Sequence, residues 1–204
     1  MTNLQKTEKQ KMLAGELYLA SDRELNAERK RVRRLLRLYN TTTEEEPEKQ
    51  LQLLQDLMGK LGSNSEIVQP FFCDYGSNIY AGNNVYIGYG GVILDCNIVE
   101  LGDNLLCGPY LQIYTAYHTT DPDLRLAKRE LELAAPVKIG SNVWIGGGVI
   151  ICPGVTIGDN TTIGAGSVVV KDIPANVVAV GNPCRVVRLL QADSSNDTSS
   201  NVNS

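Results

Sequence analysis

The sequence predicts a mainly β protein, a parallel β-helix of hexapeptide repeats that follows a helical segment and is interrupted by an ejected loop. Three observations support this fold class. Apolar residues recur at every sixth position in two long stretches, small residues follow many of them, and helical periodicity is limited to the N-terminal region. Repeats of short fixed period are typical of solenoids, in which stacked repeats bury one continuous apolar column.

The N-terminal region, residues 7–62, is expected to be helical, because apolar residues lie at roughly helical spacing through it. Its boundary signals are Asp22 as an N-cap, Thr43 with Glu46 as a capping box, Pro47 as a first-turn residue and Gly62 as a helix stop. A basic cluster also lies here, and it is either a solvated helix face or a contact for an anion or a partner subunit. Its members are Arg29, Lys30, Arg31, Arg33, Arg34 and Arg37.

The repeat is clearest after residue 136. Every sixth residue is aliphatic without a break, in the series Ile139, Ile145, Ile151, Ile157, Ile163 and Val169. A second series follows four residues later each time, at Val143, Val149, Val155, Thr161, Ser167 and Ile173. Because strand side chains alternate between two faces, both series point inward from short strands that end in sharp turns at glycine. A looser series with a two-residue shift precedes the loop, at Ala81, Ile87, Ile93, Leu101, Cys107 and Ile113.

The solenoid domain is therefore expected over residues 63–190. Residues 119–136 are charged and break the six-residue rule, which indicates a loop ejected from the coil. Long loops on rigid scaffolds often carry binding or catalytic function. Residues 191–204 are polar and low in complexity, and a disordered tail is expected because they cannot bury enough apolar surface to order themselves.

Composition limits the classes of function. The 204-residue chain has a net charge of −4, which does not favour nucleic-acid binding. No apolar run is long enough to span a membrane and no signal peptide is evident, so the expected location is cytoplasmic. The five cysteines are odd in number and scattered, which favours reduced, buried thiols. A single histidine with scattered cysteines offers no metal-site spacing, so no metal is expected.

The only histidine, His118, lies in the segment IYTAYHTTDP. Counted from Ile113, Tyr117 takes an inward position and His118 points out of the coil, next to the ejected loop. An outward histidine beside such a loop favours a functional role over a structural one. The same alternation places the side chain of Trp144 on the outer face.

Several segments together resemble one family. The AGELY segment at residues 14–18, IYTAYHTTDP, the hexads from NVWIGG onward and the GNPCRVVR finish are similar to the maltose, galactoside and nodulation sugar O-acetyltransferases. These belong to the hexapeptide-repeat acyltransferases, and the resemblance covers roughly residues 8–190. It implies a left-handed parallel β-helix, a homotrimer with active sites between subunits, and acetyl transfer from acetyl-CoA to a hydroxyl of a sugar or similar small molecule. It implies neither a metal nor an acyl-enzyme.

The resemblance also assigns roles to residues. His118 matches the catalytic histidine, and an imidazole can remove the proton of a hydroxyl that attacks a thioester. Asp74 and Asp95 match residues that hold the acceptor, although turn and cap roles are an alternative for both. The residues implied for acetyl-CoA are Gly147, Ala165, Val170, Lys171, Arg185 and Arg188, and Trp144 is expected to line the same groove or an exposed or subunit surface.

The chain departs from the family pattern at two places. Gly88 and Gly90 stand where many members have an Asn-x-Asn pair, and Ala20 stands where some members have an acidic residue, with Asp22 nearby. Two alternatives therefore stay open beside the sugar acetyltransferase: a catalytically degenerate trimeric scaffold, and an acetyltransferase with a non-sugar acceptor. The lone histidine argues against the three-histidine metal site of γ-class carbonic anhydrases, which share the coil.

Overall fold

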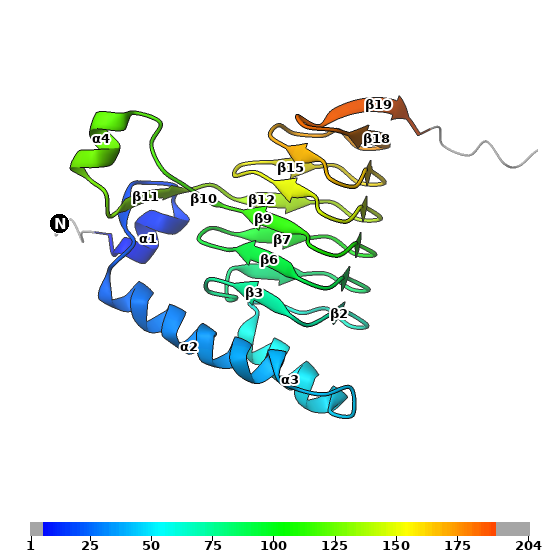
Figure 1. Cartoon of the computed structure of the whole chain (residues 1–204), viewed down its shortest axis with the longest axis horizontal. Coiled ribbons are helices and arrows are strands. Elements are labelled where there is room, and N and C mark those ends of the chain that lie inside the picture. Colours follow the sequence, from blue (N-terminus) through cyan, green and yellow to red (C-terminus); the bar gives the residue numbers. More distant parts are fainter. Residues whose placement is uncertain (1–5, 191–204) are drawn as a thin grey trace, which may run out of the picture.

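The computed structural model describes residues 6–190, so the expected tail at 191–204 lies outside the described residues. The chain forms a parallel β-solenoid whose coils stack along one axis, with helices at one end and an arm at one side (Figure 1). Each coil contributes short strands to three sheets in turn. Within these residues no helix is both long and apolar enough to cross a membrane.

The three sheets follow one another around every coil. Sheet 1 contains β2 (Glu66–Ile67), β5 (Tyr86–Ile87), β8 (Leu106–Cys107), β13 (Trp144–Ile145), β16 (Thr162–Ile163), β18 (Val177–Val180) and β19 (Arg185–Leu189). Sheet 2 contains β3 (Phe71–Cys73), β6 (Gly91–Leu94), β9 (Gln112–Tyr114), β14 (Ile150–Ile151) and β17 (Val168–Val169). Sheet 3 contains β4 (Ile79–Ala81), β7 (Val99–Leu101), β12 (Val137–Ile139) and β15 (Thr156–Ile157). All neighbours within the sheets are parallel except β18 and β19.

The six-residue pattern is confirmed as the core of the solenoid. No member of the series that starts at Ile139 is more than 1% exposed. Strand register stacks these residues directly, for example Ile145 on Ile163. The two polar members of the second series, Thr161 and Ser167, are buried with their hydroxyls donating to the carbonyls of Pro174 and Gly164. Turn carbonyls therefore satisfy the hydroxyls, which makes polar residues tolerable inside the column.

The corner between sheets 3 and 1 carries a ladder of asparagines. Asn84, Asn104, Asn142, Asn160 and Asn176 each have φ between 54° and 59°, in the left-handed region that asparagine tolerates better than most residues. Their side-chain amides donate from one coil to the next over 2.8–3.0 Å. The ladder thus sets the turn conformation and links successive coils.

Two N-terminal helices, α2 (Arg23–Asn40) and α3 (Pro47–Leu57), close one end of the solenoid and lie across its first coil (Figure 1). The first helix, α1 (Glu8–Leu13), lies beside the arm instead. Leu36 and Leu57 belong to the same buried cluster as the solenoid core. Capping by helices is needed because the end coil would otherwise expose its apolar interior.

The expectation of helix throughout residues 7–62 was wrong in two places. Strand β1 (Tyr18–Leu19) interrupts the helices, and α3 ends at Leu57. Gly62 is part of the first coil, where its N–H donates to the carbonyl of Ala81, and it is not a helix stop. A Cβ at Gly62 would come within 2.1 Å of the Gly82 carbonyl oxygen, so close stacking of coils explains this glycine.

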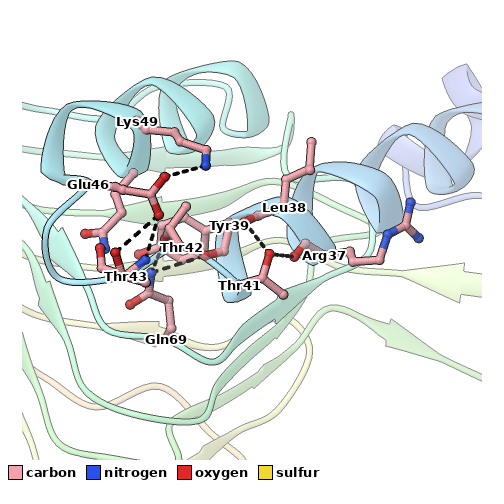
Figure 2. Close-up of polar contacts among 10 residues, drawn as sticks. Arg37, Leu38, Tyr39, Thr41, Thr42, Thr43, Glu46, Lys49 and Gln69 are labelled. Carbon is pink, nitrogen blue, oxygen red and sulfur yellow. Dashed lines mark hydrogen bonds and ion pairs between the residues drawn. The ribbon is translucent and has the colours of Figure 1, made fainter.

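The helix caps agree in part with those predicted from the sequence. Asp22 caps α2 as predicted, its carboxylate accepting from the N–H groups of Glu24 and Leu25. The capping box was wrong, because the N-cap of α3 is Glu46 and Thr43 lies before it. Figure 2 shows the arrangement, in which the Glu46 carboxylate accepts from the Thr43 N–H at 3.0 Å and from its hydroxyl at 3.3 Å. Of the two hydrogen bonds of a capping box, only the one accepted by the glutamate side chain forms.

Residues 116–134 form a structured arm instead of an irregular loop. They contain β10 (Ala116–Tyr117), α4 (Pro122–Ala127) and β11 (Leu131–Ala134), and β11 lies between β1 and β10 in an antiparallel sheet. The inward position expected for Tyr117 was wrong, because its side chain is 41% exposed. The chain leaves the coil after Thr115, which is fully buried and bonds the Leu94 carbonyl at 2.6 Å.

Candidate active site

The arm leaves the solenoid at the corner between sheets 2 and 3, here called the arm corner. The Ala135 N–H donates to the Thr115 carbonyl at 2.9 Å and closes the base of the arm. On neighbouring coils, Asp74 follows β3 and Asp95 follows β6 at the same corner. The stacking of sheet 2 therefore brings both predicted acceptor-binding residues to the edge from which the histidine-bearing arm projects.

His118 comes directly after β10 and its side chain is exposed. Tyr117 pairs with Leu133 across the arm, and extending this register by one residue places His118 opposite Glu132. Directly opposed residues in an antiparallel pair share one face of the sheet. The side chain of His118 is exposed as expected, but it lies on the arm beyond the point where the chain leaves the coil, so the six-residue count does not account for its position. His118 lines a cavity of about 460 Å³.

Asp95 holds the turn that contains Asp74. Its side chain is 0% exposed, and its carboxylate accepts from the backbone N–H groups of Asp74 at 3.0 Å, Tyr75 at 2.8 Å and Asn78 at 3.3 Å. Burial raises the pKa of this carboxyl to about 7, although the N–H bonds oppose that rise. In this geometry Asp95 positions Asp74 and is itself withdrawn from the surface.

Asp74 lies in a cluster of polar groups at the base of the arm. The Cys96 thiol donates to its carboxylate over 3.5 Å, and the Tyr18 hydroxyl donates to Glu132 at 2.7 Å. Burial raises the pKa of Asp74, while the Cys96 contact and the charge of Arg29 lower it. The sequence reasoning missed Tyr18, Cys96 and Glu132. Strand alternation in the segment ELELA was the only local signal for Glu132. That signal does not indicate a contact with the distant Tyr18.

The basic cluster of α2 is partly tied to this site. Arg29 donates to the Tyr75 hydroxyl and to the Ala20 carbonyl, and its guanidinium lies 5.6 Å from the centre of the Tyr75 ring. Arg33 is exposed, and its charge lowers the pKa of Asp74. One end of the basic cluster therefore supports the acceptor turn, whereas the rest of that face is open to solvent.

The residues that the resemblance assigned to acetyl-CoA do not meet at one place in a single chain. Gly147 and Ala165 stack at the corner between sheets 1 and 2, where the Gly166 N–H donates to the Gly147 carbonyl at 2.9 Å. Val170 and Lys171 follow β17 at the arm corner and are exposed. Sheet 2 separates these two pairs, so one copy of the chain does not enclose them together.

Three more of these residues are on sheet 1. Arg185 and Arg188 are exposed on β19, which ends the solenoid, and neither makes an ion pair within residues 6–190. Trp144 is 58% exposed on the outer face of β13, as its alternation predicted. The charged and aromatic groups are thus accessible, and they lie on a different face from the arm.

Coil stacking explains Gly88, whereas Gly90 faces a side chain of the next coil. A Cβ at Gly88 would lie 2.9 Å from the Pro109 nitrogen of the next coil. Gly90 has a φ of 72°, and a Cβ there would lie 2.7 Å from the Tyr110 ring. Asparagine at position 88 would therefore require the backbone of the next coil to move. At position 90 it would meet only the exposed Tyr110 side chain, at a left-handed φ that asparagine tolerates.

The cysteines and carboxylates show no metal centre. All five cysteines are free, and four of them are buried, as the sequence predicted. Among residues 6–190, no group of three or more His, Cys, Asp or Glu side chains is arranged to hold a metal ion.

The fold and this arrangement define a hexapeptide-repeat transferase. The family model described as "Maltose acetyltransferase hexapeptide capping motif" matches residues 11–62, and "Bacterial transferase hexapeptide (six repeats)" matches residues 136–171. Nodulation protein L of Rhizobium leguminosarum bv. viciae is 50% identical over 89% of this chain and 94% of its own length.

Two solved structures are similar over nearly the whole described chain. A maltose O-acetyltransferase from Clostridium difficile 630 has a TM-score of 0.88 and 51% identity, covering 92% of this chain and 99% of that one. A galactoside acetyltransferase in complex with coenzyme A has a TM-score of 0.88 and 39% identity, covering 92% of each chain. The chain belongs to the maltose and galactoside O-acetyltransferase family of hexapeptide-repeat proteins, and it is an acetyltransferase of that family.

Proposed function

We propose that the chain transfers the acetyl group of acetyl-CoA to a hydroxyl of a sugar or similar small molecule, with His118 as general base. The observation that carries this proposal is the position of the only histidine. It is exposed on the arm, opposite Glu132, at the corner that also holds Asp74. Family membership supports the acetyl donor, because a related structure contains coenzyme A.

In the proposed reaction His118 takes the proton from the acceptor hydroxyl as its oxygen attacks the thioester carbonyl carbon. The C–O bond forms and the C–S bond then breaks. The imidazolium returns its proton to the departing sulfur, so the histidine ends neutral and no acyl-enzyme forms. Asp74 and Glu132 accept hydrogen bonds from other hydroxyls of the acceptor and orient it, while Asp95 holds the Asp74 turn.

The donor site is proposed to lie between copies of the chain in a homotrimer. Gly147 and Ala165 are at a different corner from His118, and sheet 2 separates them within one chain. A site shared by adjacent subunits brings such corners together. The small residues Gly147 and Ala165 let the pantetheine arm approach the coil backbone, and Lys171, Arg185 and Arg188 are suited to the phosphates of coenzyme A. The cytoplasm as the location of the reaction stays a prediction from the sequence.

The test is release of CoA thiol from acetyl-CoA with and without a panel of sugars, for the wild type and for His118→Ala. We expect acceptor-dependent release that falls by roughly a hundredfold or more in the variant, the scale of removing a positioned base. Thr120→Ala is the matched control, because Thr120 is exposed on the same arm two residues away. Near-normal turnover in folded His118→Ala contradicts the mechanism. Binding of acetyl-CoA without release for any acceptor would identify the degenerate scaffold.

A further inference from the structure

The cavity beside His118 is strongly basic. It is lined by His118, Arg125, Leu126 and Arg129, and none of these is acidic. Its volume of about 460 Å³ lies within the range of small-molecule sites. Arg125 is on α4 and Arg129 lies between α4 and β11, so the outer part of the arm brings both guanidiniums to the same space as the proposed base.

Within residues 6–190 neither Arg125 nor Arg129 makes an ion pair. Arg125 donates one hydrogen bond to the Thr119 carbonyl at 2.8 Å, which anchors its position over the cavity.

Two nearby acids, Asp121 and Glu130, have other hydrogen-bond partners, and the exposed Asp123 makes no ion pair with either arginine among residues 6–190. The Asp121 carboxylate caps α4 by accepting from the N–H groups of Asp123 and Leu124 at 2.9 and 3.1 Å. Glu130 accepts from the Ser21 hydroxyl at 3.1 Å, on the side of the arm that contacts the N-terminal segment. The positive charge of the cavity is therefore left for a ligand.

Two guanidiniums in one small cavity favour a planar or tetrahedral oxyanion, because each presents a fork of N–H donors that matches a carboxylate or a phosphate. A neutral sugar would gain less from them, since its hydroxyls carry no charge. The polar cluster of Asp74 and Glu132 suits neutral hydroxyls instead. The two groups of residues are thus complementary to two different parts of one acceptor.

We propose that the acceptor carries an anionic group, a carboxylate or a phosphate, held by Arg125 and Arg129 while the reacting hydroxyl faces His118. The proposal rests on the proposed function and narrows its acceptor to acidic hydroxy compounds such as sugar acids and sugar phosphates. The same oxyanion chemistry occurs in the phosphates of coenzyme A, so the test must separate acceptor from donor.

The experiment compares glucose, glucuronate and glucose 6-phosphate as acceptors for the wild type, Arg129→Gln and Lys128→Gln. Arg129 is chosen because it has no hydrogen bond to the chain among the described residues, whereas Arg125 supports the arm. Lys128→Gln removes the same charge from the adjacent exposed residue, which does not line the cavity. We expect a charged acceptor to exceed glucose in kcat/KM by about tenfold or more. Arg129→Gln should remove most of that advantage, and Lys128→Gln should keep it.

Three outcomes would overturn the proposal. One is equal kcat/KM for neutral and charged acceptors in the wild type. If thiol release still depends on His118 in that case, the proposed function stands and only the anionic acceptor is refuted. Another is a raised KM for acetyl-CoA in Arg129→Gln with an unchanged KM for the acceptor, which assigns the arginines to the donor phosphates. If no acceptor is turned over, calorimetric titration with glucose 6-phosphate decides. Weaker binding to Arg129→Gln than to the wild type supports the site, and equal or absent binding refutes it.

Discussion

Replacing Asp95 by asparagine tests whether this buried carboxylate positions the acceptor turn. In the wild type its two oxygens accept from three backbone N–H groups, those of Asp74, Tyr75 and Asn78. Asparagine keeps one carbonyl oxygen for the Asp74 and Tyr75 donors. Its NH₂ group then faces the Asn78 N–H, so one buried donor loses its acceptor.

The magnitude follows from that single loss. A buried donor without a partner costs about 1–3 kcal/mol, so the free energy of unfolding should fall by that amount in urea titrations. The Asp74 turn is held less firmly, so the KM for the acceptor should rise about tenfold while the KM for acetyl-CoA stays unchanged. A rise of tenfold corresponds to about 1.4 kcal/mol, which is within the range of one lost hydrogen bond.

Asp103→Asn is the matched control. Asp103 also accepts a backbone N–H from the preceding coil, that of Asn83 at 2.7 Å, but it is exposed at another corner. Water can replace the lost acceptor there, so the change in stability should stay below about 1 kcal/mol and both KM values should remain at wild-type levels. The reasoning is refuted if Asp95→Asn and Asp103→Asn behave alike, or if Asp95→Asn changes kcat alone.

Two further predictions concern pH and the asparagine ladder. The pKa of Asp95 is raised from its usual value to about 7 in the folded chain, so its contribution to stability is complete below the unfolded pKa near 4 and is lost as the pH rises through about 7. The free energy of unfolding of the wild type should therefore exceed that of Asp95→Asn by more at pH 5 than at pH 8, and an equal difference at both pH values would show that the carboxyl is not desolvated. Asn142 has a φ of 58° and bonds both Asn104 and Asn160 at 3.0 Å. Asn142→Ala should destabilise the fold by about 2–4 kcal/mol in urea unfolding, because it adds left-handed strain to two lost hydrogen bonds, and Asn142→Gly by about 1 kcal/mol less. Alanine as well tolerated as glycine would mean that the backbone strain is absent.

The sequence determined the solenoid because the coil is a local, repeated structure. Each inward residue of the Ile139 series is defined by its own hexad, and burial of the whole series followed directly. The cap of α2 at Asp22 and the outward position of Trp144 were predictable for the same reason, since each depends on neighbours a few residues away.

The residues around the candidate active site are brought together by contacts between segments that are far apart in the sequence. Glu132 meets Tyr18, which is 114 residues earlier, and Asp95 meets the turn that begins at Asp74. No local pattern encodes such pairs, so the sequence identified Asp95 without showing whether it binds the acceptor or positions another residue. Tyr117 was misplaced because the six-residue rule does not say where the chain leaves the coil.

Local periodicity by itself determined which residues are buried in the column, and composition singled out His118 as the only histidine. Only the tertiary structure decided which side chains surround it, because the arm folds back as β11 and contacts β1 from the N-terminal region. It also decided that Gly88 is a glycine for stacking, since the backbone atoms that exclude a Cβ there belong to the next coil. Spacing along the chain defines a repeat, whereas the composition of a site is set by which coils and arms come into contact.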